Sequence, residues 1–197
     1  MYSFKAFNKD LTCTSGGKKF QYRLGIWNEE PEANCVQNGF HSAANPLDCL
    51  NYYRNWDEAV YYIVQLDGDI DEDGTDSKIS STRLKLLKQL TLRQFLEFSI
   101  LYIADHPFLS NNSWVEPEEK QTAKKKRTQN HFSIVRGKNP RAYVTEENAY
   151  ICLVQECMES KHIQAYAIVR ADGKKYLTDT MYSIKDIDPY DIVKISE

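Results

Sequence analysis

An eleven-residue string, Asn38 to Asp48, constrains the fold more than any other segment of the chain. It sets an aromatic residue and His41 directly before a well-marked helix start. Asn45 can cap the first exposed backbone amides, Pro46 suits the first helical position, and the final aspartate places a carboxylate in the first turn. The string therefore predicts a helix over roughly residues 45–55, held at the end of a short buried segment.

The segments around this helix have β-type composition. Residues 59–66 form a dense run of β-branched and aromatic side chains, and weaker alternation occurs at 3–7 and 19–22. These patterns predict that the first ninety residues form short strands around one helix.

A second helix is predicted to begin at Thr91. Thr91 and Gln94 have the spacing of a capping box, and apolar residues follow at helical intervals. The helix should end before Pro107, because the residue that precedes a proline is pushed out of the α region. Its apolar residues occupy so much of its circumference that we expect it to be buried on more than one side or to dock onto a partner.

The last third of the chain is predicted to be a strand meander. Two apolar runs at 150–155 and 164–170 are followed by a turn signal at Asp172-Gly173, a third segment at 174–177 and a closing strand at 191–195. We therefore expect an α+β fold with small antiparallel or mixed sheets, two main helices and a C-terminal β-meander. The expected division is an N-terminal module (1–108), an exposed linker (109–130) and a C-terminal module (131–197); whether the two modules share one core stays open.

Charge and cysteine usage narrow the setting. A formal net charge of −3 gives no global attraction to nucleic acid or to anionic lipid. The first residues lack the pattern of a signal peptide, and the longest apolar run, 95–104, is too short to cross a bilayer. Five cysteines without a CxxC pair favour free thiols in a reducing compartment. We expect a cytoplasmic protein without membrane contact.

The sequence resembles a family of uncharacterised phage- and prophage-encoded proteins. In that family the central string tends to read GFHACENPLD and is followed by tyrosines. The segments that carry the resemblance are 4–13, 20–22 with Gly25, 39–48, 68–70, 76–79 and the terminal stretch 149–182. They cover most of the chain outside about 91–130.

Departures from the family pattern limit what the resemblance implies. Ser42, Ala43 and Ala44 stand where the family string often has Ala, Cys and Glu, so no role of those side chains is carried over. The Ala/Ser/Gly-rich repeats that commonly separate the two family modules are missing. The resemblance implies a mobile-element protein that acts in the cytoplasm of a host cell, and it implies no particular chemistry.

An acidic loop gives one candidate metal site. Asp69, Asp71 and Asp73 reproduce the first half of an EF-hand loop, and Gly74 follows at the expected place. Calcium normally also needs a bidentate glutamate at position 12 of such a loop, where this chain has Ser80. We therefore favour a solvated turn over a calcium site, and no cofactor is predicted.

A basic run, Lys124, Lys125, Lys126 and Arg127, could contact phosphates of a nucleic acid. Glutamates lie just upstream of it, and no aromatic residues are interleaved with it as in single-strand binders. A solvated tether is therefore the favoured interpretation of this run.

His41 is the one candidate catalytic residue. The favoured interpretation is a histidine fixed at the start of a helix. The alternative starts from the order of elements: a short strand with Lys5, the Gly-Phe-His string, a helix with Tyr52 and Tyr53, then a β run. This order is similar to that of ADP-ribosyltransferase-like folds, which hold NAD between two small sheets with an Arg or His, a Ser or Tyr and usually a Glu. No glutamate of this sequence is assigned to that last role.

Aromatic residues of a kind common at interfaces stand beside these weak catalytic signals: Tyr52, Tyr53, Trp56 and Trp114. Tyrosine and tryptophan are favoured anchors in protein–protein contacts. We therefore expect a non-enzymatic accessory protein that binds a host or phage macromolecule, most plainly a protein; blocking a host defence would be one such role. An NAD-using enzyme is the alternative.

Overall fold

The computed structural model describes the chain except for residues 16, 36, 73–76, 110–111, 119–127 and 196–197. It divides into two compact units, unit 1 (Met1–Phe95) and unit 2 (Leu96–Glu197). The fold is mixed α/β and rich in strands, with small sheets and few helices, as the sequence predicts. The division falls inside a helix, whereas the boundary expected after residue 108 kept that whole helix with the N-terminal module.

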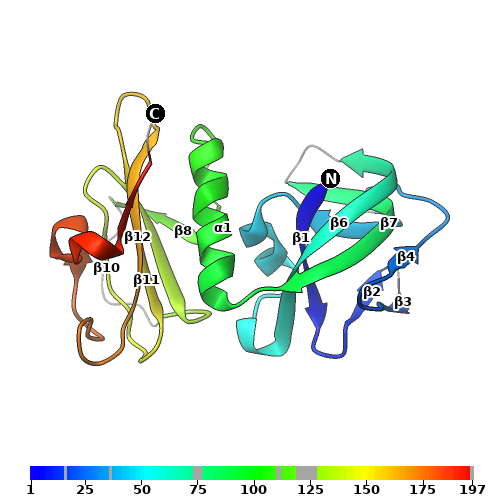
Figure 1. Cartoon of the computed structure of the whole chain (residues 1–197), viewed down its shortest axis with the longest axis horizontal. Coiled ribbons are helices and arrows are strands. Elements are labelled where there is room, and N and C mark those ends of the chain that lie inside the picture. Colours follow the sequence, from blue (N-terminus) through cyan, green and yellow to red (C-terminus); the bar gives the residue numbers. More distant parts are fainter. Residues whose placement is uncertain (16, 36, 73–76, 110–111, 119–127, 196–197) are drawn as a thin grey trace. The chain divides into compact units, whose positions relative to one another are not determined.

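Unit 1 is built on strands that meet in one sheet and one small hairpin (Figure 1). The elements are β1 (Tyr2–Asn8), β2 (Thr12–Ser15), β3 (Lys18–Gln21), β4 (Trp27–Glu29), β5 (Phe40–Ala43), η1 (Pro46–Asn51), η2 (Trp56–Glu58), β6 (Ala59–Glu72) and β7 (Lys78–Gln89). The sheet runs β4-β7-β5-β1-β6, and an additional pairing of β6 with β7 closes a ring of four strands. A core of aromatic and aliphatic side chains, including Phe7, Tyr22 and Phe40, fills unit 1.

The ring of strands is weakly joined at one place. β1 pairs with β6 along its whole length, from Tyr2 to Asn8. Its other edge pairs with β5 in one registered pair among the described residues, Phe4 with Ala43. The two strands are otherwise joined by side chains, since Ser3 donates a hydrogen bond to Ser42 and Lys5 donates one to the His41 carbonyl.

The predicted helix start at Asn45 is confirmed, but the helix is short. The Asn45 side chain accepts a hydrogen bond from the Leu47 amide at 3.1 Å, and Pro46 opens η1. Instead of one α-helix over 45–55, the segment forms one 3-10 helix, η1, which ends at Asn51. Asn55 then caps a second 3-10 helix, η2, by accepting a hydrogen bond from the Asp57 amide.

The backbone conformation at position 39 explains why the central string has a glycine there. Its φ is +80°, a conformation that L-residues rarely adopt. A Cβ at this position would also lie 2.5 Å from the Ser80 Oγ and 2.9 Å from the Ala33 Cα. Glycine is therefore required both by the backbone conformation and by the close approach of β7.

Among the described residues, unit 2 contains a five-stranded sheet in the order β14-β12-β11-β9-β8, a two-stranded sheet of β10 and β13, and most of one helix. The elements are α1 (Leu92–Asp105, shared with unit 1), β8 (Val115–Pro117), β9 (Phe132–Gly137), β10 (Arg141–Ala142), β11 (Tyr150–Glu156), β12 (Ile163–Arg170), β13 (Tyr182–Ser183), η4 (Ile184–Asp186), η5 (Pro189–Asp191) and β14 (Ile192–Lys194). The predicted capping box of α1 is confirmed, since the Thr91 and Gln94 side chains each accept the backbone amide of the other. In the described part of the chain, no helix is long and apolar enough to span a membrane.

The predicted C-terminal meander is only partly correct. The β11–β12 hairpin and the closing strand β14 form as expected. However, β9 and β8 run parallel to their neighbours, and residues 174–177 form no strand. The reason lies in the turn: the Asp172 carboxylate accepts hydrogen bonds from the amides of Lys174, Lys175 and Tyr176, which curls the chain instead of extending it.

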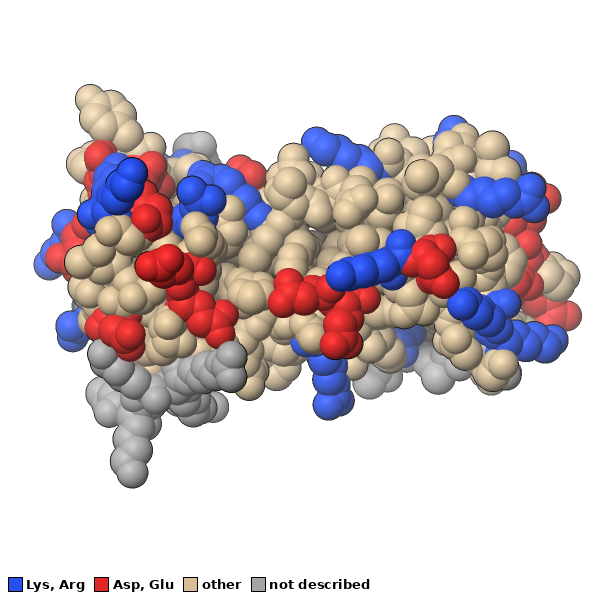
Figure 2. All heavy atoms as spheres, turned by 90° about the horizontal axis from the view of Figure 1, so that it is seen from below, with Lys and Arg blue, Asp and Glu red and all other residues tan. Residues whose placement is uncertain are grey.

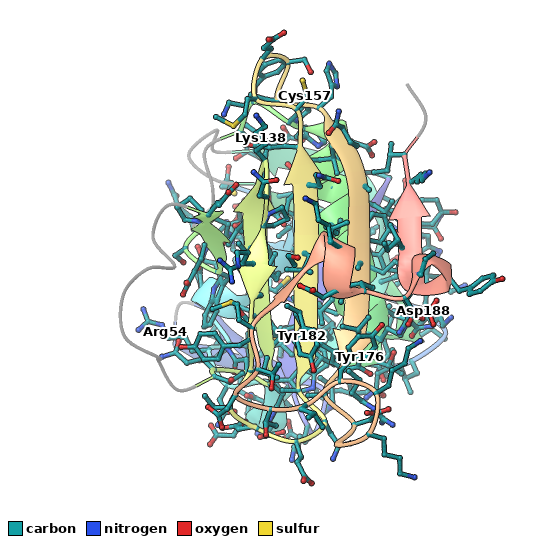
Figure 3. All side chains as sticks on the ribbon, turned by 90° about the vertical axis from the view of Figure 1, so that its left-hand side faces the viewer. Arg54, Lys138, Cys157, Tyr176, Tyr182 and Asp188 are labelled. Carbon is teal, nitrogen blue, oxygen red and sulfur yellow. The ribbon has the colours of Figure 1, made fainter. Side chains whose placement is uncertain are left out.

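The sheet of unit 2 is covered on both faces. One face carries an apolar cluster that includes Val135, Leu153 and Val169. α1 runs along the sheet (Figure 1), and the carbonyl of Pro107, just after the helix, accepts a hydrogen bond from Arg136 of β9 at 2.6 Å. Figure 3 shows Cys157 and Lys138 at one end of this sheet and Tyr176 and Tyr182 toward the other.

Candidate functional site

A solvent-open cavity of about 340 Å³ lies in unit 1, beside the place where β1 pairs with β5. Residues of β1, β5, η1 and the β2–β3 hairpin region line it, together with the first residue of β7. Several of these residues belong to the central string, including Gly39, His41 and Asp48. The string that marks the helix start thus also builds one wall of a cavity.

Lys5 supplies the most unusual chemistry of this cavity. Its side chain leaves only 7% of the residue exposed, and its Nζ donates a 2.5 Å hydrogen bond to the His41 carbonyl. The ammonium also lies 5.3 Å and 5.4 Å from the ring centroids of Phe7 and Tyr22. Among the described residues, no carboxylate comes within ion-pair distance of it. A buried cation normally has an anionic partner, because its desolvation is costly.

His41 is half-buried and lines the cavity, while its backbone carbonyl fixes Lys5. Asp48 lines the same cavity, but its carboxylate accepts hydrogen bonds from the Ser77 hydroxyl at 2.6 Å and the Ser77 amide at 3.3 Å. Asp48 therefore ties η1 to the start of β7. His41, which the sequence favours as a histidine fixed at the start of a helix, thus lines the same solvent-open cavity as Asp48.

The tyrosines that follow the string also reach the cavity. Tyr53 donates from its hydroxyl to the Cys13 Sγ at 3.1 Å, and burial raises its pKa well above the ordinary value. Tyr53 is therefore a neutral hydrogen-bond donor at physiological pH. Tyr52 is 59% exposed, and the Nζ of Lys78 lies 4.5 Å from its ring centroid. Both tyrosines and Lys78 line the cavity.

The two tryptophans predicted as binding residues lie elsewhere. Trp56 stacks on Tyr61 with ring centroids 4.4 Å apart and contacts Phe95. Trp114 packs near Phe132, and its buried Nε1 has no hydrogen-bond partner among the described residues. The structure therefore brings together Tyr52, Tyr53 and His41 but not the tryptophans.

The described residues cover only part of the two charged candidate sites, the acidic loop and the basic run. Asp69 and Asp71 lie on β6, and the Asp71 carboxylate accepts a 2.7 Å hydrogen bond from the Cys35 amide. Asp73 and the basic run 124–127 lie outside the described residues. On the face that Figure 2 shows, basic and acidic side chains are interspersed with uncharged surface.

The cysteines differ sharply in their expected reactivity. Burial raises the pKa of Cys49, in the cavity wall, to about 12. Hydrogen bonds from the Ser160 side chain and from the Ser160 and Glu159 amides lower the pKa of the half-buried Cys157. Since the thiolate is the reacting species, Cys157 should carry the larger thiolate fraction at neutral pH.

We therefore expect limiting iodoacetamide at pH 7.5 to alkylate Cys157 at least about tenfold faster than Cys49 in the folded full chain. Peptide mass spectrometry over a time course measures both rates. In concentrated urea the difference should disappear, because the unfolded thiols have similar pKa values. Faster alkylation of Cys49 in the folded protein would contradict the burial that separates the two.

The segment of the chain that matches a known protein family has nearly the same bounds as unit 1. Residues 1–98, which are 98 of the 197 residues, match a family described as a domain of unknown function (DUF7666). No curated protein and no solved structure matches the chain. The N-terminal half of the chain, which carries the cavity, is thus similar to a recognised domain family whose function is not described.

Proposed function

We propose that unit 1 binds a small organic anion in the cavity beside β1 and β5. The observation that carries this proposal is that the buried Lys5 lines a solvent-open cavity, while its ammonium has no carboxylate within ion-pair distance among the described residues. A ligand carboxylate or phosphate would supply the missing counter-charge. Charge-assisted hydrogen bonds of this kind are stronger than neutral ones.

The size and lining of the cavity restrict the ligand further. A volume of about 340 Å³ lies at the low end of the range for ligand pockets, roughly 300–1,000 Å³. The Ser42 hydroxyl, which accepts a 2.8 Å hydrogen bond from Ser3, adds a polar group at the wall. Tyr22, Tyr52 and Tyr53 also line the cavity. This combination suits a ligand that joins an anionic group to a flat ring.

An NAD-using, ADP-ribosyltransferase-like enzyme is the second candidate. It is favoured by the position of His41 and the tyrosines at a solvent-open cavity beside β1 and β5. Such an enzyme usually also needs a glutamate, and the acidic residue in the described lining, Asp48, is hydrogen-bonded to Ser77. Binding is therefore proposed ahead of catalysis.

Of the aromatic residues in unit 1 that are expected to contact a protein partner, Tyr52 is the exposed one, at 59%. Tyr53 is hydrogen-bonded to Cys13, and Trp56 stacks on Tyr61. A phage-type accessory protein that captures a small host molecule would combine the expected setting with the cavity. Both roles place Tyr52 at the point of contact.

The test is calorimetric titration of the full chain with a panel of organic anions: citrate, ribose 5-phosphate, nucleoside monophosphates, ADP-ribose and NAD. At least one should bind, and Lys5→Met should weaken it about tenfold or more. Lys88→Met, at an exposed position of β7, is the matched control and should bind like the wild type. No binding by any anion at millimolar concentration, or equal binding by Lys5→Met, would overturn the proposal. NAD turnover over hours, with and without cell extract, decides whether the enzyme candidate applies.

A further inference from the structure

We infer that Tyr52 is a stacking platform that makes the Lys5 cavity select nucleoside monophosphates from other organic anions, with Lys78 holding the platform ring in place. This inference depends on the proposed function, because it assigns the phosphate to Lys5 and the base to Tyr52. Tyr52 is then a specificity-determining residue, and Lys78 is a positioning residue.

The exposure of Tyr52 is the first step. Of the tyrosines that line the cavity, Tyr22 is buried at 5% exposure and Tyr53 is hydrogen-bonded to Cys13, whereas Tyr52 is 59% exposed. Its ring therefore keeps much of its surface available at the mouth. Every nucleobase has a flat face that can stack on such a ring, and stacking of this kind tolerates different bases.

The position of Lys78 is the second step. Its Nζ lies 4.5 Å from the Tyr52 ring centroid, within the range of a cation–π contact. Lys78 begins β7, which is held by the strand pairings of the sheet, so the contact restrains a ring that solvent exposure would otherwise leave mobile. A ring restrained before binding loses less conformational entropy when a base stacks on it.

The strand register is the third step. Phe4 pairs with Ala43, and Ala43 pairs with Lys78, so the three residues form one row across β1, β5 and β7. Two strand spacings separate the ends of this row, about 10 Å. Lys5 follows Phe4 on β1, so the backbone of the buried lysine lies about two strand spacings from that of Lys78, which contacts the Tyr52 ring. One nucleoside monophosphate can bridge a span of this size.

The experiment compares ligands that differ only in the ring. Ribose 5-phosphate and adenosine and uridine monophosphates are titrated into the full chain, Tyr52→Ala, Tyr52→Phe and Lys78→Met. Tyr52→Ala should weaken both nucleoside monophosphates about tenfold and leave ribose 5-phosphate unchanged. Tyr52→Phe keeps the ring and should bind like the wild type, while Lys78→Met should cost about two- to fivefold.

The two proposals fail in different ways. If nucleoside monophosphates bind, Lys5→Met weakens them, and Tyr52→Ala affects ribose 5-phosphate and the nucleotides equally, the stacking inference is wrong and the anion site stands. Wild-type binding of ribose 5-phosphate as tight as that of the nucleotides also overturns the inference. If no phosphate ligand binds at all, both are overturned. Tyr52 is an exposed residue, and an unchanged far-ultraviolet circular dichroism spectrum and melting temperature verify that each variant is folded.

Discussion

Replacing Glu156 by leucine is expected to destabilise unit 2 by about 3–5 kcal/mol, because it leaves the buried guanidinium of Arg136 without a carboxylate partner. The Arg136 Nε donates to the Glu156 carboxylate at 2.6 Å, and the two side chains are only 6% and 10% exposed. Arg136 Nη2 also donates to the carbonyls of Pro107 and Lys161. These carbonyls orient the guanidinium but cannot balance its charge, so the loss of the carboxylate should be costly.

Replacing the other partner, Arg136, by methionine should lower the free energy of unfolding by less. In Arg136→Met the Glu156 carboxylate keeps a second cation, the Lys161 ammonium at 3.4 Å, whose side chain is 44% exposed. The double variant Arg136→Met/Glu156→Leu should recover most of the lost stability, since replacing both charges by apolar groups of similar size is often neutral or better.

Hydrogen exchange at increasing urea measures these changes unit by unit. Peptides from β9 and β11 report on unit 2, and peptides from β1 and β6 serve as the internal control. Glu156→Leu should lower the protection of the first pair and leave the second unchanged. A double variant that is no more stable than Glu156→Leu would mean that packing, not the unpaired charge, accounts for the loss.

The parts of the fold that follow from local chemistry could be predicted from the sequence. The cap at Asn45 and the capping box of Thr91 and Gln94 are contacts between residues at most three apart, and both form. The parallel pairing of β9 with β11 could not be predicted, because parallel partners carry no short turn signal between them. The missing strand at 174–177 depends on one side chain, Asp172, that caps three amides at once.

The cavity could be predicted only in part. The sequence singled out His41, Tyr52 and Tyr53 because they lie in or just after a conspicuous string, and all three line the cavity. Lys5 was visible only as a basic residue on a short strand, and Lys78 had no signal of its own. Their contribution depends on register, which pairs Phe4 of β1 with Ala43 of β5, 39 positions later, and Ala43 with Lys78 of β7, 35 positions later. Alternation within β1 did carry one usable signal: Ser3, Lys5 and Phe7 share one face, and all three are buried.

The second large effect is expected at Lys5, and it has the opposite sign. Without ligand, Lys5→Met should leave unit 1 at least as stable as the wild type, with a gain of up to about 2 kcal/mol. The substitution removes the bond to the His41 carbonyl and two cation–π contacts, each worth roughly 0.5–3 kcal/mol. It also removes the desolvation cost of an ion buried without a carboxylate partner among the described residues, which is several kcal/mol.

The same hydrogen-exchange measurement, read on the β1 and β6 peptides, separates a structural cation from a ligand-binding one. If Lys5 is held for the sake of the fold, as Arg136 is, Lys5→Met should cost unit 1 about 3 kcal/mol or more, and ligand should make no difference. If its partner is a bound anion, a ligand at a hundred times its Kd should stabilise wild-type unit 1 by about 2.7 kcal/mol and the variant far less. A ligand that stabilises the wild type far more than Lys5→Met would identify the Lys5 ammonium as part of the binding site, because only ligand contacts made by that ammonium are missing in the variant.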